Sequence, residues 1–211
     1  MYECANIQQR KYKYKKTWFT HSDLRYHLVN FLDKSKENKI LEIGCYEGLT
    51  SVFFADNFID TQNSSLTCID PFLHIDNNDH SFLLQNGEEL NFDYNISNCK
   101  NTDRIVIHKI TSDNFFENNN NTYTFIYIDG CREPDFIQRD IENSFKFLEK
   151  LGILWIDYYE YGDGAGGADG ADGADGVDGE IKILIDDIIE KYSEQCTVIH
   201  KGYQLAIRKY L

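Results

Sequence analysis

Four acidic side chains stand at or beside the ends of short apolar segments, and they are the first candidates for chemistry. Glu42 lies within the apolar segment 40–43, and Asp70, Asp129 and Asp157 each follow directly on an apolar run. In an open α/β sheet, ligands bind beyond the carboxyl ends of the parallel strands. Acids gathered at one such edge repel each other unless a polar ligand, a cation or solvent compensates them. The pattern therefore predicts a ligand site at this edge.

A glycine turn follows the first of these segments. Residues 42–51 read Glu-Ile-Gly-Cys-Tyr-Glu-Gly-Leu-Thr-Ser, so Gly44 and Gly48 separate an apolar run from a new helical pattern. Gly44 permits backbone angles that other residues resist, and Gly48 lets a helix approach a ligand or strand closely. The helix N-terminus then offers unpaired N–H groups to a polar or anionic ligand. The middle glycine of the dinucleotide fingerprint is missing, which disfavours NAD.

Strands and helices alternate along the chain and must position these residues. Five β/α alternations precede two closing strands, which Lys201-Gly202 joins as a tight hairpin. Such alternation predicts a parallel sheet with helices on both faces, and the hairpin makes the last two strands antiparallel. The expected fold is α/β: a Rossmann-like, doubly wound sheet of seven strands, mostly parallel, with an antiparallel C-terminal hairpin. The expected strands are 39–43, 65–70, 104–110, 123–130, 152–157, 196–200 and 203–208, and the expected helices include 21–34, 49–58, 134–150 and 181–192, with a weak helical pattern in 80–100.

The length of 211 residues fits one domain, so residues 1–211 are expected to fold as a single unit. An N-terminal arm and helix, 1–38, precede the first strand. A low-complexity insertion of Gly, Ala and Asp, 162–179, is expected to be a flexible acidic loop.

The composition narrows the partners and the compartment. A net charge of −14 argues against a nucleic acid, and the basic cluster 10–16 is interpreted as a solvated N-terminal arm. No apolar run approaches membrane-spanning length, and none resembles a signal peptide. Six cysteines without C-x-x-C spacing predict free thiols in a reducing compartment. A cytoplasmic protein with no membrane partner is expected.

The glycine turn, written E-x-G-x-x-x-G-x-T, resembles motif I of the class I S-adenosylmethionine (SAM)-dependent methyltransferases. Residues 128–134, with Asp140 farther on, resemble the I-D-G-x-H-x-Y…D stretch of small O-methyltransferases of the catechol and macrolide-sugar type. Residues 151–159 resemble their G-G-x-x-x-x-D-D-Y stretch. The resemblance implies methyl transfer from SAM to a hydroxyl of a small molecule, with a sugar or glycan as the preferred substrate.

The resemblance also implies residue roles. In these families the acids after the fourth and fifth strands hold a divalent ion, usually magnesium, which lowers the pKa of a coordinated hydroxyl. Asp129 and Asp157 would be the metal ligands here. The expected cofactor-binding residues are Glu42, Gly44, Cys45, Tyr46, Gly48 and Thr50 around the methionine part of SAM, Asp70 at the ribose, and Thr111 and Ser112 beside the adenine. Asp129 is also expected to bind the cofactor. Alternatively, Asp70 caps a turn and Thr111 or Ser112 caps a helix.

Two positions depart from the family pattern. Tyr158 replaces the second acid or Asn after the fifth strand, which leaves two carboxylates for the ion. Arg132 replaces a Lys or His that can act as a base, and arginine stays protonated. Asp129 and Arg132 are thus the expected catalytic residues, with Arg132 stabilising an oxyanion.

Three other functions stay open at this point. The first is a SAM-binding protein without transferase activity, which the substitutions at Tyr158 and Arg132 suggest. The second is an NAD-dependent oxidoreductase, and the third is a nucleic-acid methyltransferase, which the charge disfavours. A homodimer is also compatible with the sequence.

Overall fold

The structure is a computed structural model, and it describes residues 11–75, 82–84, 87–159 and 178–211. Within these residues a seven-stranded sheet has the strand order β5-β2-β1-β6-β7-β9-β8. All neighbouring pairs are parallel except those that involve β9, which runs antiparallel to β7 and β8. The predicted mostly parallel sheet with an antiparallel closing pair is confirmed. Its strands are β1 (Lys39–Ile43), β2 (Ser65–Ile69), β5 (Ile105–His108), β6 (Tyr123–Ile128), β7 (Leu148–Ile156), β8 (Cys196–Lys201) and β9 (Leu205–Lys209).

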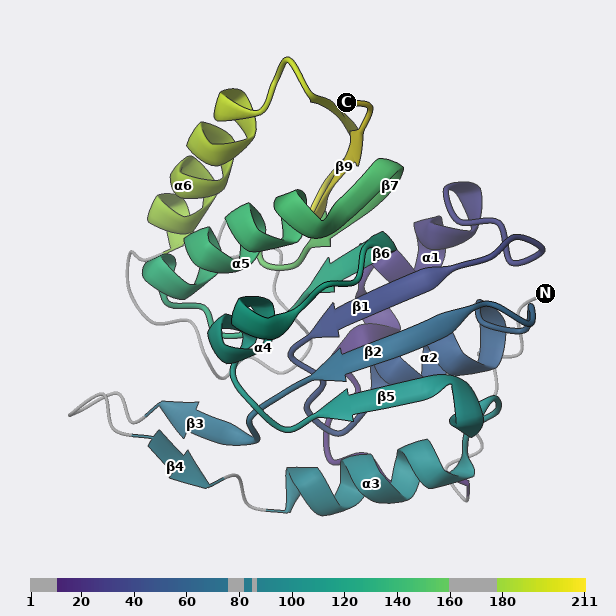
Figure 1. Cartoon of the computed structure of the whole chain (residues 1–211). Helices are drawn as coiled ribbons and strands as arrows, with labels where there is room; N and C mark the ends of the chain where they lie inside the picture. Colours follow the sequence, from purple (N-terminus) through teal and green to yellow (C-terminus); the bar gives the residue numbers. More distant parts are fainter. Residues whose placement is uncertain (1–10, 76–81, 85–86, 160–177) are drawn as a thin grey trace.

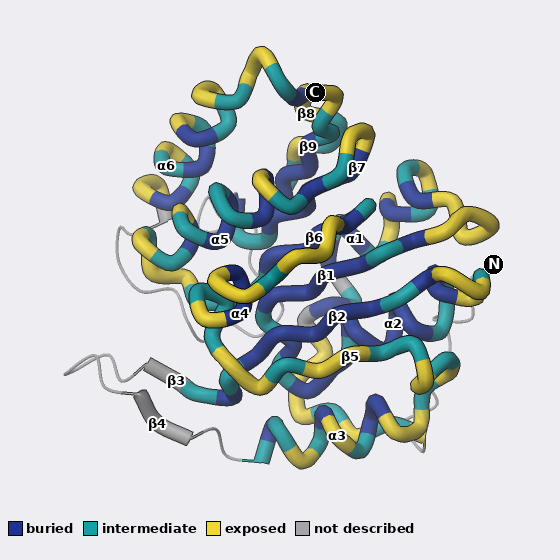
Figure 2. The backbone as a smooth tube through the Cα atoms, viewed as in Figure 1, coloured by how far each residue is buried: buried dark blue, intermediate teal, exposed yellow. Residues whose placement is uncertain are grey.

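Helices cover both faces of this sheet, as the alternation predicts (Figure 1). The inward side chains of α1 (Asp23–His27), α2 (Leu49–Asn57) and α3 (Glu88–Asn98) join one apolar core with one face of the strands. Those of α4 (Ser112–Asn118), α5 (Pro134–Phe147) and α6 (Asp178–Lys191) join a second core on the other face. The central strands are buried along most of their length, while the outer helix faces are exposed (Figure 2).

The strand register brings the predicted site residues to one row. Ile43 of β1 pairs with Ile69 of β2 and with Ile128 of β6, and Ile128 pairs with Ile156 of β7. The residue after each of these is Gly44, Asp70, Asp129 or Asp157. Backbone hydrogen bonds continue the ladder into this row, from Asp129 N to Ile43 O (2.8 Å) and from Asp157 N to Ile128 O (2.9 Å). The prediction that acids gather at one edge of the sheet is therefore confirmed for Asp70, Asp129 and Asp157, which follow β2, β6 and β7.

The segment before β1 is not the single helix expected for 21–34. It consists of a 3₁₀ turn (Trp18–His21), the short helix α1 and a second 3₁₀ turn (Leu28–Asn30). Ser22 caps α1, because its Oγ accepts a hydrogen bond from Arg25 N (3.3 Å). The apolar residues of this segment do face the core, since Leu24, Leu28 and Leu32 are buried. The backbone, however, forms three short helical turns instead of one continuous helix.

Residues 80–100 contain a strand as well as a helix. β4 (Phe82–Leu84) pairs antiparallel with β3 (Leu73–Ile75) and forms a separate two-stranded sheet, which the sequence analysis missed. Gly87, with φ +91°, precedes α3. A residue with left-handed backbone angles breaks a regular helix, so the helix can begin only after Gly87.

Two boundaries differ from the prediction near the C-terminus. The predicted helix 134–150 ends at Phe147, and β7 already begins at Leu148. The closing hairpin is wider than expected, since Lys201 pairs with Leu205 and residues 202–204 form the turn.

The basic segment 11–16 lies against the folded domain. The Lys13 N–H donates to Asn95 Oδ1 (2.6 Å), and the Lys15 N–H donates to Glu47 Oε2 (2.5 Å). The prediction of a solvated arm is wrong for this backbone, because buried polar side chains anchor it. The low-complexity insertion lies outside the described residues, apart from its last two residues, which begin α6. No helix in the described ranges is both long and apolar enough to cross a membrane.

Candidate active site at the strand ends

The glycine turn between β1 and α2 packs directly on the end of β6. Gly44 has φ +85°, and a Cβ placed on it would lie 2.0 Å from the carbonyl oxygen of Asp129. Gly48 has φ +78°, and a Cβ there would lie 3.0 Å from the Phe92 ring of α3. Both positions therefore require glycine for two reasons, the backbone angle and the space. The result is a close approach between the turn and the strand that carries Asp129.

Asp70 holds the glycine turn in place. Its Oδ2 accepts hydrogen bonds from the N–H groups of Cys45 and Tyr46, both at 2.8 Å, and its Oδ1 accepts one from Phe72 N (2.7 Å). The turn-capping interpretation of Asp70 thus matches the geometry.

Several of the predicted cofactor-binding side chains point into the core. Glu42 is 0% exposed, Cys45 4% and Thr50 7%. These residues can present only backbone groups to a ligand in this conformation. Tyr46 is partly exposed, with φ +49°, and burial together with the charges of Glu47 and Glu88 raises the pKa of Tyr46 to about 12.

Thr111 and Ser112 lie beyond the end of β5, next to the row of acids. Thr111 caps α4, because its Oγ1 accepts a hydrogen bond from Asn114 N (3.4 Å). Ser112 hydrogen-bonds the carboxyl group of Asp140, which α5 holds almost completely buried beneath Gly130. Burial raises the pKa of Asp140 to about 7, although the Ser112 contact lowers it. The two strand-to-helix turns are therefore linked through a buried acid.

Asp129 and Asp157 form a carboxyl pair at the ends of β6 and β7. Asp129 Oδ2 accepts a hydrogen bond from the Tyr127 hydroxyl (3.1 Å), and Oδ1 accepts one from the Tyr158 hydroxyl. Burial and the neighbouring charge of Asp157 raise the pKa of Asp129 well above its usual range. Burial also raises the pKa of Asp157, but a contact from Gln204 lowers it. Since two adjacent carboxyls resist ionising together, we expect the pair to release its two protons in separate steps.

Gln204 is a central residue of this site that the sequence did not reveal. It lies in the β8–β9 turn and is completely buried. Its Nε2 donates to Asp157 Oδ1 (2.7 Å), and its Oε1 accepts hydrogen bonds from Trp155 Nε1 (2.9 Å) and Leu24 N (2.7 Å). Nothing in a single sequence distinguishes a buried turn glutamine from an exposed one. The burial of Gln204 follows only from the packing of the folded strands.

Glu47 was also missed, although it stands inside the glycine turn. It is 1% exposed, and its Oε1 accepts a hydrogen bond from Asn91 Nδ2 (2.7 Å). Its Oε2 accepts the Lys15 N–H. Glu47 therefore ties the turn to α3 and to the N-terminal segment.

Arg132 is exposed beside the carboxyl pair. Its guanidinium carbon lies 4.0 Å from the centre of the Tyr158 ring, and its charge lowers the pKa of Asp157. Stacking on an aromatic ring suits a guanidinium and keeps it near the pair. A fixed positive charge at this place can stabilise an oxyanion, but it cannot accept a proton.

The donor set at Asp129 and Asp157 does not fit the magnesium site that the resemblance implied. Magnesium requires a near-octahedral set of oxygen ligands. Both oxygens of Asp129 already accept tyrosine hydroxyls, and Asp157 Oδ1 accepts the Gln204 amide. Burial, which raises the pKa of Asp129, also favours its protonated form, which is a poor cation ligand. These groups form a hydrogen-bonded carboxyl pair that can accept a proton from a hydroxyl.

Comparisons with known proteins agree with the fold. A family model described as a methyltransferase domain matches residues 41–159. A search of curated proteins gave no match. Among solved structures, an O-methyltransferase from Streptomyces achromogenes (TomG, solved with SAM) has a TM-score of 0.58 at 13% identity over 90% of this chain and 81% of its own. A proposed caffeoyl-CoA O-methyltransferase from Staphylococcus aureus has a TM-score of 0.60 at 18% identity, with 96% and 87% covered. An rRNA methylase from Streptococcus thermophilus has a TM-score of 0.59 at 13% identity, with 94% and 100% covered.

Proposed function

The chain belongs to the methyltransferase-domain family, and on that premise we propose that it transfers the methyl group of SAM to a hydroxyl of a small polar molecule. The observation that carries the proposal is the proton-sharing pair of Asp129 and Asp157 beside the glycine turn. A hydroxyl is a weak nucleophile until a base accepts its proton, and this pair can supply that base.

The proposed binding of SAM rests on the glycine turn between β1 and α2. Backbone groups of Gly44, Cys45, Tyr46 and Gly48 would surround the methionine part, and Glu42 and Thr50 would support them from below. Asp70 would accept a ribose hydroxyl, and Thr111 and Ser112 would lie beside the adenine. The absence of a side chain at Gly44 fits this use, because its Cβ would collide with Asp129 O. SAM, when bound, supplies an electrophilic methyl group on a positively charged sulfur.

The reaction then needs a base for the hydroxyl proton and a positive charge to stabilise the oxyanion that forms. Asp157, ionised and oriented by the Gln204 amide, accepts the proton of the substrate hydroxyl at a carboxylate oxygen. The pair, which already holds one proton in common, would then carry two protons and no net charge, which its burial favours. Arg132 holds the developing oxyanion by its fixed positive charge. The substrate oxygen keeps the electron pair of its O–H bond and uses it to form the new C–O bond, while the methyl–sulfur bond of SAM would break and leave its electron pair on sulfur as the neutral thioether.

A sugar or another polyhydroxylated molecule is the preferred substrate. An edge that combines carboxyl groups, tyrosine hydroxyls and an arginine recognises several hydroxyls through hydrogen bonds. Free thiols at five described cysteines agree with a reaction in the reducing cytoplasm.

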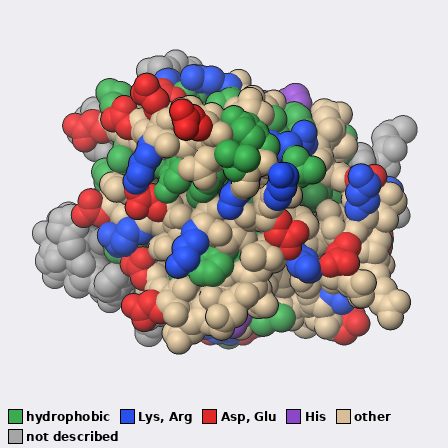
Figure 3. All heavy atoms as spheres, turned by 45° about the horizontal axis from the view of Figure 1, so that its top comes forward, with side chains coloured by type: hydrophobic (Ala, Val, Ile, Leu, Met, Phe, Trp, Pro, Cys, Tyr) green, Lys and Arg blue, Asp and Glu red, His purple; other side chains and the backbone are tan. Residues whose placement is uncertain are grey.

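RNA is the second candidate substrate, because rRNA methylases are among the similar structures. The net charge of −14 opposes it, since nothing supplies an overall positive field for phosphates. On the face drawn in Figure 3, lysines and arginines are scattered among acids and form no continuous basic patch.

Methyl transfer from isotopically labelled SAM tests the proposal, with products identified by mass spectrometry. The substrates would be a panel of sugars, phenols and RNA, each incubated with and without a metal chelator. We expect a methyl ether formed at a substrate hydroxyl, at a rate that the chelator does not change. In Asp157→Asn this rate should fall at least about 100-fold. A methylated nucleobase would favour the RNA function. Magnesium-dependent turnover would overturn the metal-free base, and SAM binding without any product would indicate a non-catalytic SAM-binding protein.

A further inference from the structure

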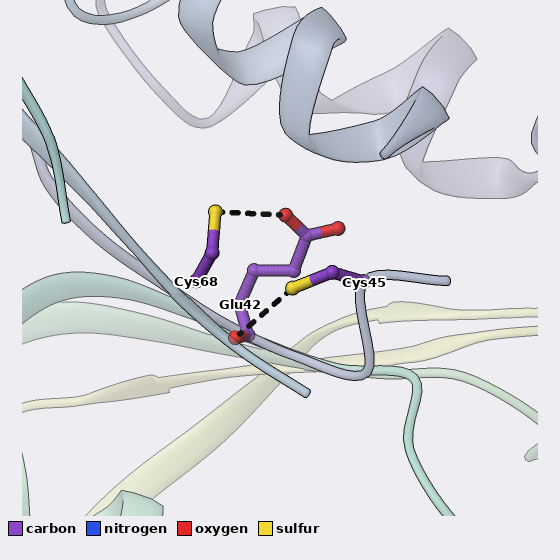
Figure 4. Close-up of side chains that lie close together, drawn as sticks. All are labelled: Glu42, Cys45 and Cys68. Carbon is purple, nitrogen blue, oxygen red and sulfur yellow. Dashed lines mark hydrogen bonds between the residues drawn. The ribbon is translucent and has the colours of Figure 1, made fainter. Parts of the chain in front are cut away.

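A buried cluster lies behind the glycine turn, on the core side of β1 and β2. Glu42 of β1 stands directly beside Cys68 of β2 in the register, and Cys45 enters from the turn (Figure 4). One carboxylate oxygen and the two sulfurs all lie within 4.8 Å of one another. Glu42 is 0% exposed, Cys68 1% and Cys45 4%. Within the described ranges, no other group of three or more His, Cys, Asp or Glu side chains meets this spacing.

The hydrogen bonds inside the cluster are incomplete. Glu42 Oε2 has only a long contact with Cys68 Sγ (3.9 Å), and Glu42 Oε1 has no hydrogen-bond partner. Ser51 Oγ, in the first turn of α2, is buried beside this carboxyl, yet it also makes no hydrogen bond of normal geometry. An unsatisfied buried carboxyl oxygen is costly, typically about 1–3 kcal/mol. Buried groups of this kind usually pair with a ligand, a water or an ion.

We propose that Glu42, Cys45 and Cys68 form a binding site for a thiophilic divalent cation, with Zn²⁺ as the best match. Zinc accepts thiolate sulfur at about 2.3 Å and carboxylate oxygen at about 2.0–2.2 Å, in a tetrahedral arrangement. Ligand atoms within 4.8 Å of one another reach these distances after small side-chain rotations. Two thiolates select zinc over magnesium and calcium, which require oxygen ligands. The Ser51 hydroxyl adjoins the site and can complete the coordination or hydrogen-bond the carboxylate.

The charges of the site also suit a divalent ion. Binding transfers the two thiol protons and any carboxyl proton to solvent, and no atom changes its oxidation state. Two thiolates, one carboxylate and a divalent cation leave one net negative charge. Ser51 belongs to the first turn of α2, whose N-terminus stabilises a nearby negative charge.

Such an ion would act on the glycine turn from the side opposite the proposed cofactor. The Cys45 side chain faces the cluster, while its N–H donates to Asp70 Oδ2 (2.8 Å). Fixing Cys45 to β1 and β2 therefore fixes the turn. The inference goes beyond the proposed function, because the ion has a structural role and takes no part in methyl transfer.

Zinc titration of the purified full chain, followed by calorimetry and by metal analysis after gel filtration, tests the inference. We expect one equivalent of Zn²⁺ per chain. Cys68→Ser should lower the affinity at least about tenfold. The matched control is Cys196→Ser, which removes another buried free thiol at the start of β8 and should leave the affinity unchanged.

A second measurement needs no variant and remains informative if Cys68→Ser does not fold. Alkylation in a mild denaturant that exposes the buried thiols, followed by peptide mass mapping, should show that Zn²⁺ protects Cys45 and Cys68 but not Cys131. Substitution with Co²⁺ should give the near-ultraviolet charge-transfer absorption of a thiolate-bound ion. Absence of stoichiometric binding, retained affinity in Cys68→Ser, or unprotected Cys45 and Cys68 would each overturn the inference. In that case the two thiols are ordinary core side chains.

Discussion

The hydroxyl of Tyr158 donates a hydrogen bond to Oδ1 of Asp129 across the ends of β7 and β6. Tyr158 adopts φ +62°, an angle that is unfavourable for a bulky side chain and is maintained only by its surroundings. The resemblance noted in the sequence places a further metal ligand at this position. A hydrogen-bond donor thus stands where a cation would need an acceptor, which fits the proposed role of the carboxyl pair as a proton acceptor.

The first prediction concerns Tyr158→Phe. The Tyr158 hydroxyl lowers the pKa of Asp129, so its removal should raise that pKa further. Methyl transfer requires the pair to be ready to accept a proton, so the rate rises as pH passes through its ionisation. The acidic limb of the pH–rate profile should move to higher pH in the variant. Tyr159→Phe is the matched control, because that hydroxyl donates to Asp186 (2.6 Å), and its profile should keep the wild-type midpoint. An unshifted midpoint in Tyr158→Phe would contradict the assignment.

The second prediction concerns the glycine turn. Gly44→Ala places a Cβ 2.0 Å from Asp129 O at φ +85°, so both strain and collision oppose it. Gly87→Ala has a similar angle, φ +91°, but its Cβ would meet only Lys15 Nζ at 3.9 Å. The control should lose about 1–2 kcal/mol of unfolding free energy from the backbone angle alone. Gly44→Ala should lose clearly more, as measured by chemical denaturation, and equal losses would show that the turn can move away from β6.

The sequence predicted the sheet well because its signals were local. Apolar runs that end in an acid, such as Ile128–Asp129, mark the strand ends, and Gly44 marks the turn. Together they were sufficient to infer the row of acids. β3 and β4 were missed because Phe82–Leu84 is a short apolar run that also suits a helix, and only its pairing with Leu73–Ile75 determines its conformation.

The third prediction tests the buried amide of Gln204. Gln204→Leu keeps the volume but leaves Leu24 N, Trp155 Nε1 and Asp157 without this partner. Losing several buried hydrogen bonds should cost about 2–4 kcal/mol of unfolding free energy. Gln138→Leu, at an exposed position of α5, should change it by no more than about 0.5 kcal/mol. A small effect at Gln204 would mean that water replaces the amide.

The fourth prediction concerns Asp140, whose pKa burial raises from 3.8 to about 7. Between these values the folded state keeps a proton that the unfolded chain releases, so the free energy of unfolding falls as pH rises. From pH 5 to pH 8 this group should remove roughly 2–3 kcal/mol. In Asp140→Asn that part of the decline should vanish, whereas the exposed Asp135→Asn should retain it. Parallel curves for wild type and Asp140→Asn, measured by urea denaturation at several pH values, would refute this.

The details of the candidate site could not be read from the sequence. Residue type and position pointed to Asp129, Asp157 and Arg132, but the partners of a carboxyl group decide between a metal ligand and a base. Those partners include Tyr127, which is one β-strand residue among many, and Gln204, which lies 47 residues beyond its partner Asp157. The side-chain directions of Glu42 and Cys45 likewise follow from strand register and turn angles, which only the folded chain reveals.

Calorimetric titration of the full chain with SAM, S-adenosylhomocysteine and NAD tests the central claim most directly. The glycine turn held by Asp70 should bind SAM and S-adenosylhomocysteine at one site per chain and should not bind NAD. Gly44→Ala, if folded, should lose this binding, while Gly87→Ala should keep it. Binding of NAD, or no binding of SAM by the folded wild-type chain, would contradict the account.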